Sequence, residues 1–301
     1  MNLQQGTAPA PFTLTSGIEK ERTAGMIPLE DYSEDIIGKV MRGHGISGTE
    51  VCRKSGISEA ELAALLRGEA LEDSLRKVAP ALGLNADALV TCANKVWYPD
   101  QPDTFDGFDM ANTPFHDMEV NAYVVWDPAT SLAIVFDSGA DSRPLLKTIS
   151  DHGLKVELVL LTHSHTDHVI DLNRLVSETG SPPVWVNVRE SDDEDFPDGV
   201  QTFDAGKTFK VGGLTIDSVL TNGHSPGGTT FIINGLNRRL AIVGDSLFSG
   251  SMGGSMTAFE VARLNNIEHI LTLPPDTILA PGHGPLTTVE QENKNNPFFA
   301  K

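Results

Sequence analysis

The sequence has little cysteine, no long apolar run and few basic residues, and each shortage excludes a class of protein. Only Cys52 and Cys92 occur in 301 residues, which excludes a disulfide framework and agrees with a reducing compartment. No stretch reaches the length of a transmembrane helix, and residues 1–11 contain no basic region followed by an apolar run. We therefore expect a cytoplasmic protein without a membrane segment.

Positive charge is scarce: 22 Lys and Arg stand against 41 Asp and Glu, and the formal net charge is −19. Such a charge discourages polyanionic substrates and argues against a nuclease. The acidic run 190–195 is interpreted as a solvated surface segment. The length suffices for a catalytic core and a small helical unit.

The densest group of metal-ligand side chains is Thr162-His163-Ser164-His165-Thr166-Asp167-His168, which follows the apolar stretch 156–161. Imidazole nitrogen and carboxylate oxygen bind zinc, iron(II) and manganese. His163 and His165 are two apart at the end of an extended segment, so both can point to one side. Asp167 and His168 follow as the chain turns. A polar loop would explain one histidine, but four such groups indicate a metal site.

Three further candidates follow apolar segments downstream, where loops at strand ends present functional groups. They are His224 in 222–228, Asp245 in 243–248 and His283 in 281–285. Singly, each has a structural explanation as a turn residue. Together with the first group they form one ordered pattern.

That pattern is His-x-His-x-Asp-His, then His, then Gly-Asp, then Gly-His-Gly. Over roughly residues 115–301 it resembles the metallo-β-lactamase-fold hydrolases, especially the glyoxalase II-like branch. Residues 121–125 resemble the branch's opening strand, 135–139 its second strand, and 244–251 its Gly-Asp-x-Leu-Phe segment. The resemblance implies an α/β protein with a four-layer αβ/βα sandwich.

The resemblance also implies two metal sites. His163, His165 and His224 would form the first, Asp167, His168 and His283 the second, and Asp245 would bridge them. The implied cofactors are two divalent ions, zinc first, with iron or manganese as alternatives. Two neighbouring cations lower the pKa of a shared water and stabilise charge on reacting atoms.

The expected function is therefore a metal-dependent hydrolase, similar to hydroxyacylglutathione hydrolase, in which a metal-bridged hydroxide attacks a small ester or thioester. Asp167 and Asp245 are its expected catalytic carboxylates, and Asp167 is a candidate proton acceptor. Only 18 residues (301 − 283) follow His283, whereas glyoxalase II has a helical C-terminal domain that helps hold glutathione. Shorter relatives without that domain include persulfide dioxygenase, so a mononuclear-iron dioxygenase remains an alternative. In addition, Gly254 stands where the family pattern has Arg.

Residues 31–95 carry helix signals instead of strand signals. Ser47 to Glu50 and Ser58 to Glu61 each read as a capping box, and Gly56-Ile57 between them predicts a tight turn. The segment resembles the Cro and repressor type of helix-turn-helix domain across five helices. A DNA-binding regulator with a metal-dependent sensor domain is therefore the non-enzyme alternative.

The charges of this segment disfavour DNA binding. It holds eight Lys or Arg against ten Asp or Glu, and its expected recognition helix, 58–67, offers Glu59, Glu61 and Arg67. Arg42, Arg53 and Lys54 are its candidate phosphate contacts. We instead expect a docking, lid or dimerising role, which leaves a homodimer open, and a small-molecule substrate for the catalytic part.

The predicted organisation is a flexible arm at 1–30, a helix-turn-helix domain at 31–95, a linker at 96–114 and the catalytic domain at 115–301. The four histidines outside the expected ligand set are interpreted as structural, although His116 lies near the start of the catalytic domain, from where it could approach the pocket. These histidines are His44, His116, His152 and His269.

Overall fold

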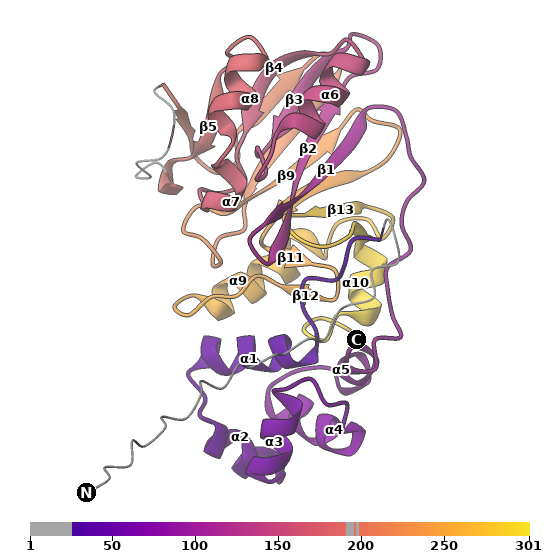
Figure 1. Cartoon of the computed structure of the whole chain (residues 1–301), viewed down its shortest axis with the longest axis vertical. Coiled ribbons are helices and arrows are strands. Elements are labelled where there is room, and N and C mark those ends of the chain that lie inside the picture. Colours follow the sequence, from indigo (N-terminus) through magenta and orange to yellow (C-terminus); the bar gives the residue numbers. More distant parts are fainter. Residues whose placement is uncertain (1–25, 191–195, 197–198) are drawn as a thin grey trace, which may run out of the picture.

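The computed structural model of the chain describes residues 26–190, 196 and 199–301 (Figure 1). The predicted arm at 1–30 therefore lies mostly outside the described residues. Its described end packs against the protein, since Leu29 is buried. No helix in the described part is both long and apolar enough to cross a membrane.

Two six-stranded sheets pack face to face. The first has the order β1-β2-β3-β4-β5-β6 and the second β14-β13-β10-β9-β8-β7. The strands of the first are β1 (Phe108–Phe115), β2 (Met118–Trp126), β3 (Leu132–Phe136), β4 (Lys155–Leu160), β5 (Val184–Asn187) and β6 (Gln201–Phe203). Those of the second are β7 (Thr208–Val211), β8 (Leu214–Leu220), β9 (Thr229–Asn234), β10 (Leu240–Gly244), β13 (Ile278–Pro281) and β14 (Thr287–Thr288). A short hairpin, β11 (Leu247–Phe248) and β12 (Ser251–Met252), follows β10.

Helices cover both outer faces, which gives the four layers that the sequence predicts (Figure 1). Strand β10 shows the cause, because all its residues are buried and successive side chains point to opposite faces. Ile242 faces the core between the sheets, and Val243 faces the helices. The covering helices are α6 (Arg143–Asp151), α7 (Thr166–Val169) and α8 (Leu172–Glu178) on the first sheet, and α9 (Phe259–Asn265) and α10 (Val289–Asn295) on the second.

The N-terminal part is helical: α1 (Ser33–His44), α2 (Gly48–Ser55), α3 (Glu59–Leu65), α4 (Glu72–Ala81) and α5 (Ala86–Ala93). Ser58 and Glu61 form the complete predicted capping box. Ser47 caps α2, but the Glu50 side chain pairs with Lys54 at 3.1 Å. The predicted reciprocal bond of the first box is replaced by this ion pair.

These five helices do not have a hydrophobic core of their own. Ile36 and Leu75 belong to the same buried cluster as Val243, Phe259 and Phe298 of the sheet domain. The helical unit is thus continuous with the outer helical layer of the second sheet. Its resemblance to a helix-turn-helix domain stays a prediction.

The predicted linker at 96–114 is wrong from Phe108 onward. Strand β1 begins at Phe108 and pairs with β2 along its full length. The expected opening strand at 121–125 is therefore part of the second strand, β2, and 135–136 belong to β3. As an edge strand, β1 tolerates polar residues and Pro114, and these obscure its apolar alternation in the sequence.

Candidate metal centre

The seven candidate ligands lie at one rim of the sandwich, in loops or in the short helix α7, in segments that follow strands. His163, His165 and α7 with its Asp167 and His168 follow β4, and the other three follow β8, β10 and β13. Because these strands carry their loops to the same rim, residues up to 120 positions apart meet. The structure brings all seven together in two sets.

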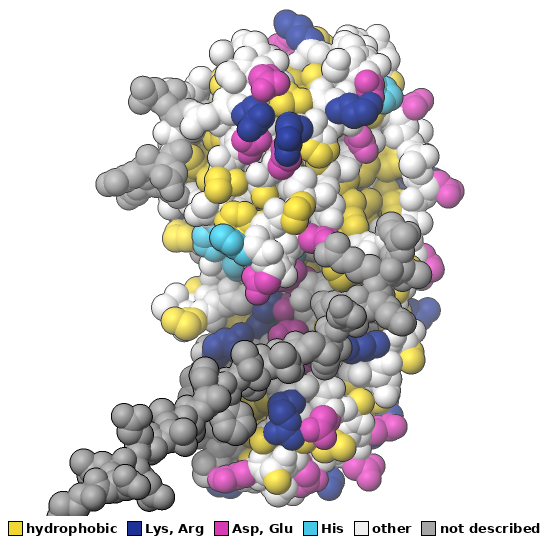
Figure 2. Space-filling view, in the orientation of Figure 1, with side chains coloured by type: hydrophobic (Ala, Val, Ile, Leu, Met, Phe, Trp, Pro, Cys, Tyr) yellow, Lys and Arg dark blue, Asp and Glu magenta, His cyan; other side chains and the backbone are white. Residues whose placement is uncertain are grey.

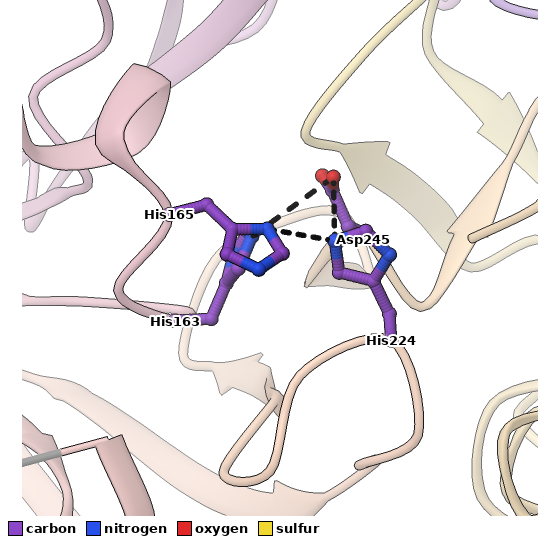
Figure 3. A group of neighbouring side chains, drawn as sticks. All are labelled: His163, His165, His224 and Asp245. Carbon is purple, nitrogen blue, oxygen red and sulfur yellow. Dashed lines mark hydrogen bonds and ion pairs between the residues drawn. The ribbon is translucent and has the colours of Figure 1, made fainter. Parts of the chain in front are cut away.

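The first set comprises His163, His165, His224 and Asp245, whose ligand atoms lie within 4.8 Å of one another (Figure 3). Nδ1 of His165 is 3.1 Å from Nε2 of His163 and 2.9 Å from Nε2 of His224. Figure 3 shows the three imidazoles and the carboxylate turned toward a common point. The arrangement suits one cation with nitrogen and oxygen ligands.

The second set comprises Asp167, His168 and His283, again within 4.8 Å. Oδ2 of Asp167 lies 3.2 Å from Nε2 of His283 and 3.5 Å from Nε2 of His168. All three side chains are largely shielded from solvent. This set also suits a divalent cation.

Asp245 lies between the two sets. Its Oδ1 atom is 3.3 Å from Nε2 of His168, and its Oδ2 atom is 3.3 Å from Nε2 of His224 and 3.4 Å from Nε2 of His283. One carboxylate therefore faces ligand nitrogens of both sets. This is the position expected of a bridging ligand.

Comparison with known proteins agrees with this geometry: residues 117–283 match the metallo-beta-lactamase superfamily. The chain belongs to the metallo-beta-lactamase superfamily. Its relatives include hydroxyacylglutathione hydrolase GloC of Haemophilus influenzae, 30% identical over 62% of this chain and 95% of the relative. The probable metallo-hydrolase YqgX of Bacillus subtilis is 28% identical over 62% and 95%.

Among solved structures, TTHA1623 in a di-iron-bound form is 27% identical, with a TM-score of 0.51 over 63% of this chain and 100% of that chain. The superfamily match begins at residue 117, so it leaves the five N-terminal helices outside. The fold and the branch predicted from the sequence are confirmed for the sheet domain.

The donor atoms of this superfamily member fit metal ions. His168 Nε2 and Asp245 Oδ1 are buried and make no hydrogen bond within the described part of the chain, and unsatisfied buried polar atoms are costly. Burial opposes ionisation of Asp245, yet His283 and His168 hold its pKa well below the usual range. Burial likewise opposes protonation of His168, but Asp245 and Asp137 raise its pKa to about 10. The buried carboxylates are therefore stabilised by neighbouring positive charge, and metal ions bound between the two ligand sets would supply that charge.

Hydrogen bonds to Nδ1 orient three of the imidazoles, on the side of the ring away from the candidate metal centre. Nδ1 of His168 donates to Oδ2 of Asp137 at 2.9 Å, and Nδ1 of His283 donates to the Glu119 carbonyl at 2.7 Å. Nδ1 of His224 donates to the Gly254 carbonyl at 3.1 Å. These bonds select the tautomer that leaves Nε2 free toward the centre. In the sequence Asp137 stands in a strand motif, and no local pattern there predicts this role.

The interpretation of Glu190 as part of a solvated acidic run is wrong. Its side chain is buried and accepts hydrogen bonds from the backbone N–H and the hydroxyl of Ser164, at 3.2 and 2.7 Å. It also accepts from the backbone N–H of Gly227. Glu190 therefore ties the loop of His163 and His165 to the loop of His224. Residues 191–195, the rest of that run, lie outside the described residues.

His116 does not approach the centre. It is exposed at the turn between β1 and β2, with its ring 4.5 Å from that of Phe115. His44 contacts Phe259, and His152 contacts Trp126. None of these histidines belongs to either ligand set.

A cleft of about 540 Å³ opens beside His165 and His224. One wall is formed by the loop segments 222–226 and 254–258. The other comes from α1, through Lys39 and Arg42. The N-terminal helical unit therefore takes part in shaping the entrance to the candidate metal centre.

Proposed function

We propose that the protein is a two-metal hydrolase that cleaves a small ester or thioester. The observation that carries the proposal is the position of Asp245, whose carboxylate faces nitrogens of both ligand sets at 3.3–3.4 Å. Relatives named hydroxyacylglutathione hydrolase and metallo-hydrolase support the hydrolase class. The di-iron-bound form of TTHA1623 supports the number of ions.

In this proposal His163, His165 and His224 would hold one ion and Asp167, His168 and His283 the other, with Asp245 as the ligand shared by both sets. The metals are zinc, iron or manganese, all of which accept these donors. When bound, such ions supply Lewis acidity that lowers the pKa of water and stabilises negative charge on an attacked carbonyl oxygen.

The protein's own groups have two tasks in this proposal. Some orient the ligand imidazoles, and one carboxylate accepts and releases a proton. Asp137 and the carbonyls of Glu119 and Gly254 hold three imidazoles with Nε2 toward the centre. Asp167, 13% exposed, has more access to solvent than Asp245 at 6%. We assign Asp167 as the proton acceptor, because an acceptor must exchange its proton with solvent after each turnover.

The cleft supports a small substrate, since about 540 Å³ lies within the usual range for small-molecule sites.

The helical unit has few cations that are available to bind DNA phosphates. Near the expected recognition helix, Arg67 pairs with Glu69, and Lys54 and Arg53 pair with Glu50. Of the candidate phosphate contacts, Arg53 and Lys54 are paired with Glu50 and Arg42 lines the cleft, so we assign the unit to packing and to shaping the cleft.

The proposal is tested by the metal content of the chain purified without added metal, measured by elemental mass spectrometry. Near two ions per chain should be found, falling toward one in His168→Ala. The matched control is His269→Ala, which removes an exposed imidazole from outside both sets and should leave the content unchanged. The same preparations should hydrolyse members of a thioester and lactone panel.

A single iron that is insensitive to His168→Ala would overturn the two-metal mechanism. Oxygen uptake with a persulfide would then identify the dioxygenase alternative. Salt-resistant, sequence-selective DNA binding without hydrolysis would identify the regulator.

A further inference from the structure

Helix α1 presents two cations to the cleft beside the metal centre. Lys39 and Arg42 are three residues apart, so they lie on the same face of the helix. Both line the cleft together with His165 and His224. Figure 2 shows histidine side chains at the surface of the sheet domain and Lys or Arg side chains below them, at the level of α1.

The position of this wall is set by close packing. A Cβ atom added at Gly43 would lie 2.4 Å from Cγ of Phe259, so α1 and α9 approach as closely as a glycine permits. Nε2 of His44 lies 3.2 Å from Oε1 of Glu260, also on α9. The face that carries Lys39 and Arg42 is therefore held beside the metal centre.

The two cations have different surroundings. Lys39 forms an ion pair with Asp31, donates to the Met252 carbonyl at 3.0 Å and is only 13% exposed. Its charge is neutralised within the fold. Arg42 is exposed, and its guanidinium makes no hydrogen bond or ion pair within the described part of the chain.

Arg42 is an unpaired cation at the mouth of the cleft in a chain of net charge −19. Its guanidinium contacts no carboxylate in the described part of the chain, so its donors are free to bind a ligand. A guanidinium presents two parallel N–H donors that match the two oxygens of a carboxylate. One guanidinium, with two parallel N–H donors and one positive charge, matches the charge of a carboxylate monoanion better than that of a phosphate dianion.

We propose that Arg42 binds a carboxylate on the substrate, away from the carbonyl that is cleaved. The substrate class is thereby an acyl ester or thioester that carries a second, anionic end. This inference rests on the proposed hydrolase function. It makes the N-terminal helical unit a determinant of substrate specificity.

The first test compares two esters whose acyl chains differ in a terminal carboxylate, mono(4-nitrophenyl) succinate and 4-nitrophenyl pentanoate, with the spontaneous cleavage of each subtracted. In Arg42→Met, kcat/KM for the succinate should fall about tenfold or more, mostly through KM, because one charge-assisted hydrogen-bonded contact is lost. The value for the pentanoate should stay within about twofold. Arg42→Lys should be intermediate, because it keeps the charge and loses the fork.

The matched control is Arg53→Met on α2, whose side chain is 72% exposed and lies outside the cleft. It should leave both esters unchanged. Equal losses on both esters in Arg42→Met, or no loss on the succinate, would overturn the proposal.

A second readout does not require turnover. The Nε–H resonance of Arg42, assigned by its absence in Arg42→Met, is followed in the metal-free full-length chain during titration with glutarate or neutral glutaramide. A saturable shift with glutarate alone is expected, and no shift would overturn the carboxylate site. If neither ester is cleaved by the parent protein, the proposed hydrolase function fails, and this titration still decides whether Arg42 binds a carboxylate.

Discussion

Oδ2 of Asp137 lies 2.9 Å from Nδ1 of His168, and both side chains are almost fully buried. The same carboxylate accepts hydrogen bonds from the hydroxyl and the backbone N–H of Thr162, at 2.7 and 2.8 Å. Asp137 thus links a ligand of the second set to the end of β4, where the first set begins. A contact of this kind fixes both the tautomer and the direction of the imidazole.

Replacing Asp137 by Asn should weaken metal binding at the second set by about 10–100-fold, as losses of outer hydrogen bonds to ligands typically do. Occupancy is measured by titration with a zinc chelator. The control is Asp141→Asn, which removes the half-buried carboxylate of the same loop that pairs with Arg143 and belongs to neither ligand set. Unchanged zinc affinity in Asp137→Asn would refute the orienting role.

Replacing Glu190 by Gln should lower the free energy of unfolding by about 1–3 kcal/mol, because one buried N–H group loses its acceptor. The loops of His163 and His224 would also lose their connection, so the first set should bind zinc more weakly. Urea unfolding of metal-free protein measures the first effect. Glu178→Gln, at an exposed position of α8, should change neither quantity.

Glu292 should make stability depend on pH. Burial raises its pKa from 4.5 to about 7, although Thr287, Asn296 and the Gly250 N–H donate hydrogen bonds to it. Between these values the folded state holds a proton that the unfolded chain has lost. The free energy of unfolding contributed by this group therefore falls as pH rises from about 4.5 to about 7.

The measurement is urea unfolding of the parent chain and Glu292→Gln across that range. The difference between them should change by roughly 3 kcal/mol, with the parent chain losing stability toward neutral pH. Glu290→Gln, exposed on the same helix, should follow the parent chain. Parallel profiles for the parent chain and Glu292→Gln would contradict the assignment.

Gly43→Ala should destabilise the chain by about 1–3 kcal/mol, since the added Cβ collides with Phe259 and pushes α1 away from α9. It should also raise KM for the succinate ester through displacement of Arg42. In Gly48→Ala the new Cβ meets only Leu62 at 3.4 Å, so stability should hold or rise. Thermal unfolding separates the two variants, and equal melting temperatures would contradict the packing argument.

The sheet domain and its candidate ligands were predictable because their sequence patterns are local, with the informative residues close together in the chain. Each ligand stands directly after an apolar run, and alternation within buried strands such as β10 decides which side chains face the core. The capping pair Ser58 and Glu61 was readable for the same reason, since its members are three residues apart. Strand β1 was missed because its polar residues hide its periodicity.

The sequence by itself determined the family and the identity of the seven candidate ligands, because residue types in a fixed order suffice for both. Only the tertiary structure decided that Asp137 supports His168, that Glu190 joins two ligand loops, and that α1 brings Arg42 to the cleft. These contacts join residues 26 to more than 100 positions apart. Local propensity does not specify such distances, since they follow from how the two sheets pack on each other and how the helical unit packs on the outer face of the second sheet.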